Sequence, residues 1–164
     1  MSSEVGVSSA EFRRACGRFA TGVTIASVLD DRGTPHGLTV SSFTSVSLDP
    51  PLILICLGHR VSAIDAFRAS AHFGINVLAE DQHDLAERFT RKGQDRFEGL
   101  KWRRGENGVP ILAGVLAAIE CVVRQRFTAG DHDVFVGEVV SVRVAAGAPL
   151  IHFASHYRRL DVSR

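Results

Sequence analysis

Two long segments rich in β-branched and aromatic residues, at about 115–128 and 133–145, constrain the fold of this chain most strongly. They are joined at Gly130-Asp131-His132, and residues of this kind are typical of a turn. Between residues 140 and 144, three valines alternate with a serine and an arginine, as in a half-buried antiparallel strand. The sequence therefore predicts a long β-hairpin with one apolar face.

Shorter segments complete a predominantly β pattern. A β-branched run from Val23 ends in the turn sequence Asp30-Asp31-Arg32-Gly33, which predicts a first hairpin. Ser8 and Glu11 have the spacing of a capping box, so we expect a helix of about three turns to follow. Further strands are predicted near 38–43, 52–57, 73–78 and 150–153, and short helices near 62–69 and 82–89. Many strands with few helices favour a mainly β, antiparallel barrel over a doubly wound sheet.

Composition limits the organisation of the chain and its partners. With 164 residues, 45% of them apolar and 23% charged, we expect a disordered tail over residues 1–8 and a single domain over 9–160. The net charge is only +1 and the basic residues are scattered, which argues against nucleic acid or a membrane surface as a partner. Three cysteines without C-x-x-C spacing indicate neither a disulfide framework nor a metal site. We therefore expect an unprocessed cytoplasmic protein.

Several common catalytic motifs are missing from the sequence. It contains no G-x-G-x-x-G after a strand, no G-x-x-x-x-G-K-[ST], no H-E-x-x-H and no G-x-S-x-G. Rossmann dinucleotide binding, P-loop phosphate transfer, zincin proteolysis and α/β-hydrolase chemistry therefore lose support.

The most unusual segment is Thr39–Ser47, which carries six hydroxyl side chains in nine residues. Hydroxyls and backbone N–H groups suit a polar ring system or a phosphate, since both present acceptors that need short donors nearby. An exposed edge strand explains the same composition equally well.

Two other short segments have both a binding and a plain interpretation. His59-Arg60-Val61-Ser62 lies where a strand gives way to a helix, so it can receive a phosphate, or Ser62 is simply a helix cap. His132 in its turn can act near neutral pH, although such a turn needs no function. Arg91, Lys92 and Arg96 can form the rim of an anion site or a solvated face.

The ordered combination of these segments resembles the short-chain flavin reductases of two-component monooxygenases, over about residues 9–160. The similarity rests on the segments Phe12–Thr24, Gly37–Leu52, Phe73–Leu78, Asp95–Phe97, Gly130–Val139 and Pro149-Leu150.

This resemblance implies an FMN-binding split β-barrel that forms a homodimer and needs no Rossmann domain. It implies an NAD(P)H:flavin oxidoreductase that reduces FMN or FAD, with NADH or NADPH as cosubstrate, by hydride transfer. The reduced flavin would diffuse to a separate monooxygenase component.

The resemblance also implies roles for individual residues. His132 would position the nicotinamide, without acting as an acid or base. The flavin would lie along the hydroxyl-rich segment with its phosphate near residues 59–62. The residues that would bind the cofactor are Thr39, Val40, Ser41, Ser42, Ser45, Val46, Ser47, Cys56, His59, Arg60, Ser62, Lys92, Phe97 and Tyr157.

Three alternative functions are also compatible with a barrel fold. A non-enzymatic FMN-binding electron carrier would hold flavin and not oxidise NADH. A split-barrel oxidase of a phosphorylated vitamin would need a denser cluster of Arg and Lys. A barrel for another ligand would have no flavin affinity.

Overall fold

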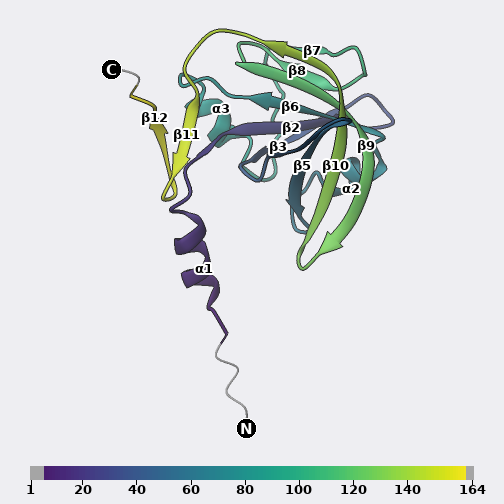
Figure 1. The fold of residues 1–164 in the computed structure, drawn as a ribbon. Coiled ribbons are helices and arrows are strands. Elements are labelled where there is room, and N and C mark those ends of the chain that lie inside the picture. The colour runs from purple at the N-terminus through teal and green to yellow at the C-terminus, as the bar shows by residue number, and fades with distance from the viewer. Residues whose placement is uncertain (1–5, 162–164) are drawn as a thin grey trace.

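The computed structural model describes residues 6–161, so the first five residues of the predicted tail over 1–8 lie outside the described residues. Within this range, seven strands form one antiparallel sheet (Figure 1). In spatial order they are β3 (Pro35–Val40), β2 (Thr24–Leu29), β6 (His72–Val77), β9 (Ala117–Ala129), β10 (His132–Val144), β5 (Pro51–Gly58) and β4 (Thr44–Leu48).

The predicted long hairpin is confirmed as β9 and β10, thirteen residues each. Its strands pair from His132 opposite Ala129 to Val144 opposite Ala117. Gly130 closes the turn with a φ of +61°, which favours glycine. The register shifts between Val139 and Ser141. Such a bulge increases the local twist of a hairpin.

The remaining elements surround this sheet. Two small sheets add β1 (Thr21–Gly22), β11 (Leu150–Phe153) and β12 (His156–Arg159), and β7 (Trp102–Arg104) with β8 (Pro110–Leu112). The helices are α1 (Ser9–Cys16), α2 (Ile64–Ala69) and α3 (His83–Arg88). The mainly β, antiparallel class is confirmed. The expected strand at 38–43 is wrong in its bounds, because β3 ends at Val40 and β4 begins at Thr44. Strands β1, β7, β8 and β12 were not predicted.

The core of the described residues consists of one large cluster, one smaller cluster and a minor third cluster of Val109, Ile111 and Ala118. Phe67 of α2 meets Phe135 of β10 edge to face, with ring centroids 6.1 Å apart, in the large cluster beneath the sheet. In the smaller cluster, Phe97 packs against Phe89 and Trp102 at 5.0 and 5.8 Å. These contacts fix α2 and the loop ending at Phe97, and both elements border the candidate site.

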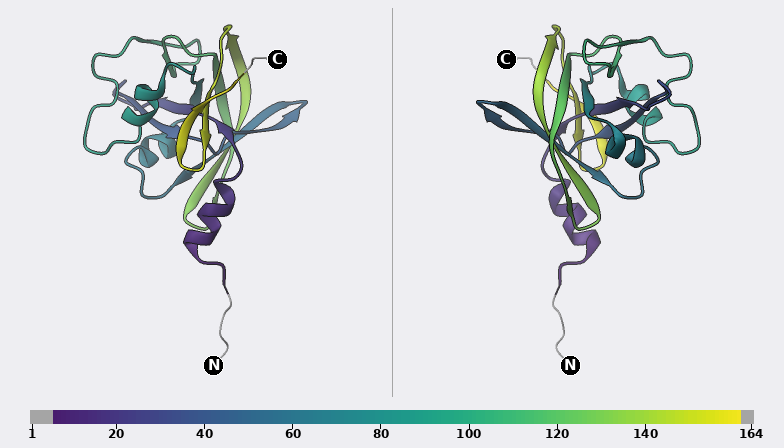
Figure 2. Two further views of the ribbon diagram at one scale, coloured as in Figure 1. Left: turned by 90° about the vertical axis from the view of Figure 1, so that its left-hand side faces the viewer. Right: turned by 90° about the vertical axis from the view of Figure 1, so that its right-hand side faces the viewer.

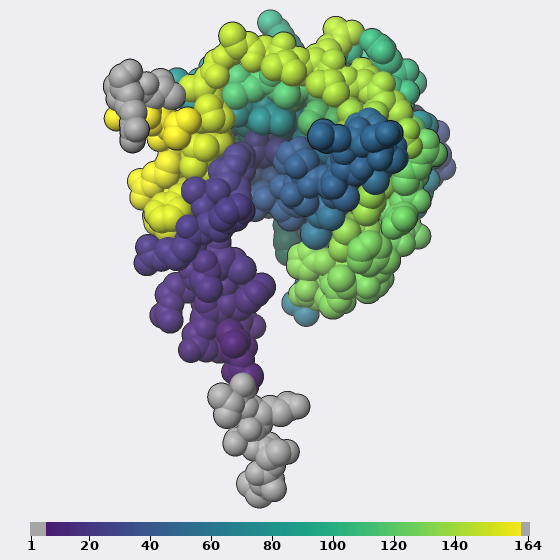
Figure 3. All heavy atoms as spheres, in the orientation of Figure 1, coloured from purple at the N-terminus to yellow at the C-terminus, as the bar shows by residue number. Residues whose placement is uncertain are grey.

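Two apolar surfaces lie exposed in the single chain. The capping box of α1 is present, yet the helix has eight residues instead of about three turns and buries none of them. Phe12 in α1 and Phe19 after it are 62% and 78% exposed. Val140, Val142 and Val144 of β10, predicted to lie on a half-buried face, are also exposed, up to 80% at Val144. Figures 2 and 3 show α1 projecting from the body of the molecule.

Between residues 6 and 161, no helix has the length and apolar character required to cross a bilayer.

Candidate functional site

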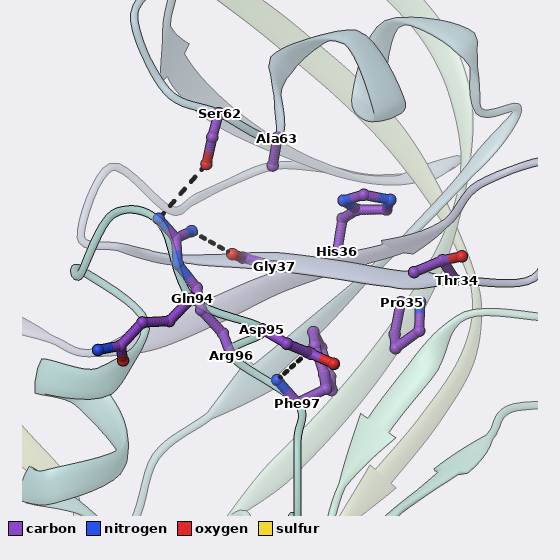
Figure 4. Close-up of a pocket in the computed structure, with 10 residues that line it drawn as sticks. All are labelled: Thr34, Pro35, His36, Gly37, Ser62, Ala63, Gln94, Asp95, Arg96 and Phe97. Atoms are coloured by element: carbon purple, nitrogen blue, oxygen red, sulfur yellow. Dashed lines mark hydrogen bonds between the residues drawn. The ribbon is translucent and has the colours of Figure 1, made fainter.

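A hollow of about 270 Å³ lies between the start of β3, the N-terminal end of α2 and the loop that leads to Phe97 (Figure 4). His36 and Gly37 come from β3, Ser62 from the segment before α2, and Arg96 from the loop. Segments far apart in the sequence therefore bring a cation and a hydroxyl to one cavity.

Arg96 is held in place by backbone carbonyls. Its Nη1 donates to the carbonyl of Gly37 at 2.6 Å and its Nε to the carbonyl of Arg91 at 2.8 Å. Its Nη2 lies 3.5 Å from Ser62 Oγ (Figure 4). Burial lowers the pKa of Arg96, but an arginine remains charged at neutral pH. None of the ion pairs found within residues 6–161 includes Arg96, so its charge is available to an anion.

A second hollow, of about 540 Å³, adjoins the first at His36 and Ser62. Its charged lining is mainly acidic, with Asp30, Asp31 and Asp65. The hydrogen bond from His36, whose Nε2 lies 2.9 Å from Asp30 Oδ2, lowers the pKa of Asp30 to about 2. An anion is therefore favoured near Arg96 and disfavoured along the acidic wall.

The end of β5 lies beside the start of β10. Cys56 pairs with Val134, and Gly58 pairs with His132. A Cβ at Gly58 would lie 3.5 Å from His132 Nε2, so the imidazole rests against the glycine backbone. His132 is exposed, and its Nδ1 lies 2.7 Å from Asp131 Oδ1. The hydrogen bond from His132 lowers the pKa of Asp131.

In the hydroxyl-rich segment, some side chains are hydrogen-bonded to the backbone of other elements and others are exposed. Thr39 donates to the carbonyl of Ala86 at 2.6 Å. Ser42 Oγ donates to the carbonyl of Cys56 at 2.9 Å and accepts from its N–H at 3.0 Å. Thr39 thus ties β3 to α3 and Ser42 fixes the backbone of β5. Three other predicted residues, Ser41, Ser45 and Val46, are exposed.

The other predicted residues are placed as follows. Val40 is buried, Ser47 is half-buried, and Arg60 and Lys92 are exposed without an ion pair in the described part of the chain. Phe97 is 4% exposed within the smaller core cluster. Tyr157 lies on β12 with its ring 4.8 Å from that of His83, outside the lining of the two hollows. The structure thus brings Ser42 to Cys56, His132 and His59 to the end of β5, and Ser62 to the Arg96 hollow.

Three residues of this region were missed or left undecided by sequence reasoning. Arg96 was weighed as a rim residue, whereas His36 and Asp133 were not proposed. The signal for Asp133 was an acidic residue at the start of the apolar run Val134-Phe135-Val136. A carboxylate in such a strand needs partners, which only the tertiary structure reveals.

Comparisons with known proteins identify the family of this chain. Residues 16–161 match the flavin reductase like domain. The chain is 45% identical over 156 residues to the FMN reductase (NADH) SmoA of Agrobacterium fabrum, covering 95% of this chain and 88% of that protein. It is 39% identical over 148 residues to the reductase component of a 4-nitrophenol 4-monooxygenase/4-nitrocatechol 2-monooxygenase of Rhodococcus opacus, covering 90% and 79%.

The solved structures agree as well. The NADH:FAD oxidoreductase SgcE6 of Streptomyces globisporus superimposes with a TM-score of 0.89 at 35% identity, covering 94% of each chain. Some relatives are longer, since this chain spans only 42% and 57% of two Rhizobium meliloti proteins, a probable flavin reductase and a stachydrine N-demethylase reductase subunit. The predicted family resemblance is confirmed, and the chain belongs to the flavin reductase like domain family.

Proposed function

We propose that this protein is an NAD(P)H:flavin oxidoreductase that reduces FMN or FAD. The observation that carries the proposal is the connection between the Arg96 hollow and the end of β5. Only two residues separate His59, beside the His132 hairpin, from Ser62, which lines the hollow. One short segment therefore connects the candidate phosphate-binding group to the hairpin that carries the candidate nicotinamide-binding group, His132. The FMN reductase and the NADH:FAD oxidoreductase named above support the same assignment.

The residues present fit a phosphorylated flavin. Arg96 and Ser62 would hold its phosphate, because a guanidinium and a hydroxyl offer charge and short donors together. Arg60 and Lys92 are exposed, two residues before Ser62 and four residues before Arg96 in the sequence, and would add positive charge near the phosphate. The isoalloxazine would lie along residues 39–47, where Ser42 fixes the backbone against Cys56.

The two cofactors supply the redox chemistry, in which a hydride passes from reduced nicotinamide to flavin. The chain's part is to bind and orient them. His132, resting against Gly58 and hydrogen-bonded to Asp131, would position the nicotinamide. Hydride transfer itself requires no protein acid or base, so we assign none.

Purified protein mixed with NADH or NADPH, with and without FMN or FAD, tests this function through the nicotinamide absorbance in air. We expect rapid oxidation only when flavin is added, and the rates will rank the cosubstrates. Flavin retained after purification without NADH oxidation would contradict the proposal and favour the electron carrier. A protein without flavin affinity would favour a barrel for another ligand.

We also propose that the reduced flavin serves a separate monooxygenase by diffusion. Support comes from the Rhodococcus relative, a reductase component of a monooxygenase. Cytochrome c placed behind a dialysis membrane that retains proteins should be reduced when FMN can cross, under anaerobic conditions with NADH. Cytochrome c that stays oxidised while flavin is reduced on the enzyme side would contradict diffusion. The single domain over 9–160 and the cytoplasmic location remain predictions.

A homodimer is the third part of the proposal. An isolated helix shorter than about 12–15 residues is marginal in water, yet the eight residues of α1 bury nothing in their own chain. Leu48, on the edge strand β4, is 95% exposed, and Figure 2 shows the β4–β5 hairpin projecting from the body. The recess in Figure 3 lies between α1 and the β9–β10 hairpin. A second copy would cover these apolar surfaces symmetrically.

Light scattering tests the dimer. We expect twice the chain mass for the wild type and a monomer for Val142→Glu, because a charge in an apolar interface is costly. Leu160→Glu, at an exposed apolar position near the end of β12, is the matched control and should remain dimeric. A wild type that is monomeric at micromolar concentration would contradict the homodimer.

A further inference from the structure

The start of β10 contains a buried carboxylate that the proposed chemistry does not use. Asp133 follows His132 directly and is 3% exposed. Its strand neighbours Val134 and Phe135 are apolar and buried as well. An ionised side chain in such a place is retained only when it is fully hydrogen-bonded.

Asp133 receives three hydrogen bonds from three different parts of the chain. Arg68 of α2 donates from Nε to Oδ2 at 2.7 Å. His59, after β5, has its Nε2 3.0 Å from Oδ1, and Thr128 of β9 donates to the same oxygen at 3.0 Å. The hydrogen bond from Arg68 lowers the pKa of Asp133, so the carboxylate is ionised near neutral pH. It therefore joins α2, the end of β5 and the β9–β10 hairpin.

Two further hydrogen bonds connect the β9–β10 hairpin to the end of β5 and to α2. The backbone N–H of His59 donates to the carbonyl of Asp131 at 3.0 Å. Arg126 of β9 donates to the carbonyl of Arg68 at 2.7 Å. The hairpin end that carries His132 is thus attached to the segment that carries Ser62 toward Arg96. A change at Asp133 would weaken this attachment, while the pairing of β5 with β10 and the contact of Ser62 with Arg96 remain.

We propose that Asp133 is a positioning residue for the reductase reaction: its buried carboxylate holds His59 and the β9–β10 hairpin so that His132 stays at a fixed place relative to Ser62. This inference rests on the proposed function. Asp133 itself would touch neither cofactor, since its oxygens are occupied by protein donors.

The test compares Asp133→Asn with Glu120→Gln. Glu120 is equally buried, but it accepts the N–H groups of Glu106 and Asn107 at 3.0 and 2.6 Å, far along β9 from the hairpin turn. We expect Asp133→Asn to lower kcat/KM for NADH roughly ten- to 100-fold through the KM for NADH, since small misplacements of positioning groups have effects of this size. The Kd for FMN should change less than about twofold, and Glu120→Gln should change neither constant.

A second readout does not depend on activity. Amide hydrogen exchange at His59 should become faster in Asp133→Asn and not in Glu120→Gln, because the bond to Asp131 is loosened only in the first. If Asp133→Asn does not fold, Thr128→Val, which removes one bond to the same carboxylate, should show the same two effects in smaller measure.

Unchanged NADH kinetics in a folded Asp133→Asn protein, or equal losses in both variants, would overturn the positioning role. An inactive wild type would refute the proposed function itself, and with it this role in the reaction. An active wild type with an unaffected Asp133→Asn variant would refute only this inference.

Discussion

Replacing Arg96 by alanine should weaken the binding of FMN and leave riboflavin binding almost unchanged. Arg96 is the cation of the hollow, and riboflavin lacks the phosphate that this cation would hold. A hydrogen bond to a charged partner contributes about 1.5–3 kcal/mol, which corresponds to roughly 10- to 150-fold in Kd. Because the guanidinium is only partly buried, solvent screening places the expected effect at the lower end, about tenfold.

The same substitution has a structural cost that must be separated from binding. Arg96 donates to the carbonyls of Gly37 and Arg91, and each bond contributes about 1 kcal/mol. Unfolding in urea gives this cost, and the quenching of flavin fluorescence gives the two Kd values. Arg91→Ala removes an exposed side chain from the same loop and should alter neither Kd. An equal loss for FMN and riboflavin in Arg96→Ala would refute the phosphate assignment.

Three further predictions concern stability and reactivity. Phe135→Ala should lower the free energy of unfolding by about 3–5 kcal/mol, since the ring is fully buried; a loss below about 1 kcal/mol in urea unfolding would contradict the packing. The pKa of Asp30 is lowered to about 2 in the folded protein, so its stabilising effect is present above its unfolded value near 3.9 and is lost as pH falls toward 2. The free energy of unfolding should therefore decrease less steeply between pH 4 and pH 2 in Asp30→Asn than in the wild type. The same pH dependence in both proteins would refute the pairing with His36. Burial raises the pKa of Cys121 to about 12, so iodoacetamide at pH 8 should modify the exposed Cys16 first, as mass spectrometry would show; equally fast labelling of Cys121 would be inconsistent with the core.

A strand could be predicted from the sequence where its own residues and the adjacent turn carry the signal. The β9–β10 hairpin follows from β-branched runs and turn residues. Strands β7 and β12 were missed because they are short, with three and four residues, and contain charged side chains. Their strand conformation depends on pairing with a neighbour, which a single sequence does not display.

The exposed faces were the main error in the predicted fold. The alternation at residues 140–144 indicated a half-buried face of β10, but Val140, Val142 and Val144 are exposed in the single chain, as are all apolar residues of α1. Periodicity indicates an apolar face and does not indicate whether the same chain covers it. Val144 and Phe12 are examples, since both are apolar and both are exposed in the single chain.

The candidate site was predictable only in part for a related reason. The segment around His59 and Ser62 stood out by residue type and position. Arg96 and Asp133 became interpretable only after folding, because their partners Gly37 and Arg68 lie 59 and 65 residues away. Long-range contacts of this kind have no local sequence signal.

Catalytic turnover of flavin tests the central claim most directly. Under anaerobic conditions, a small amount of protein is mixed with excess NADH and a large excess of FMN, and the flavin absorbance is followed. We predict that many equivalents of FMN per protein chain are bleached, with one NADH consumed for each. Bleaching that stops at one equivalent per chain, or fails to occur, would contradict a reductase that releases its reduced flavin.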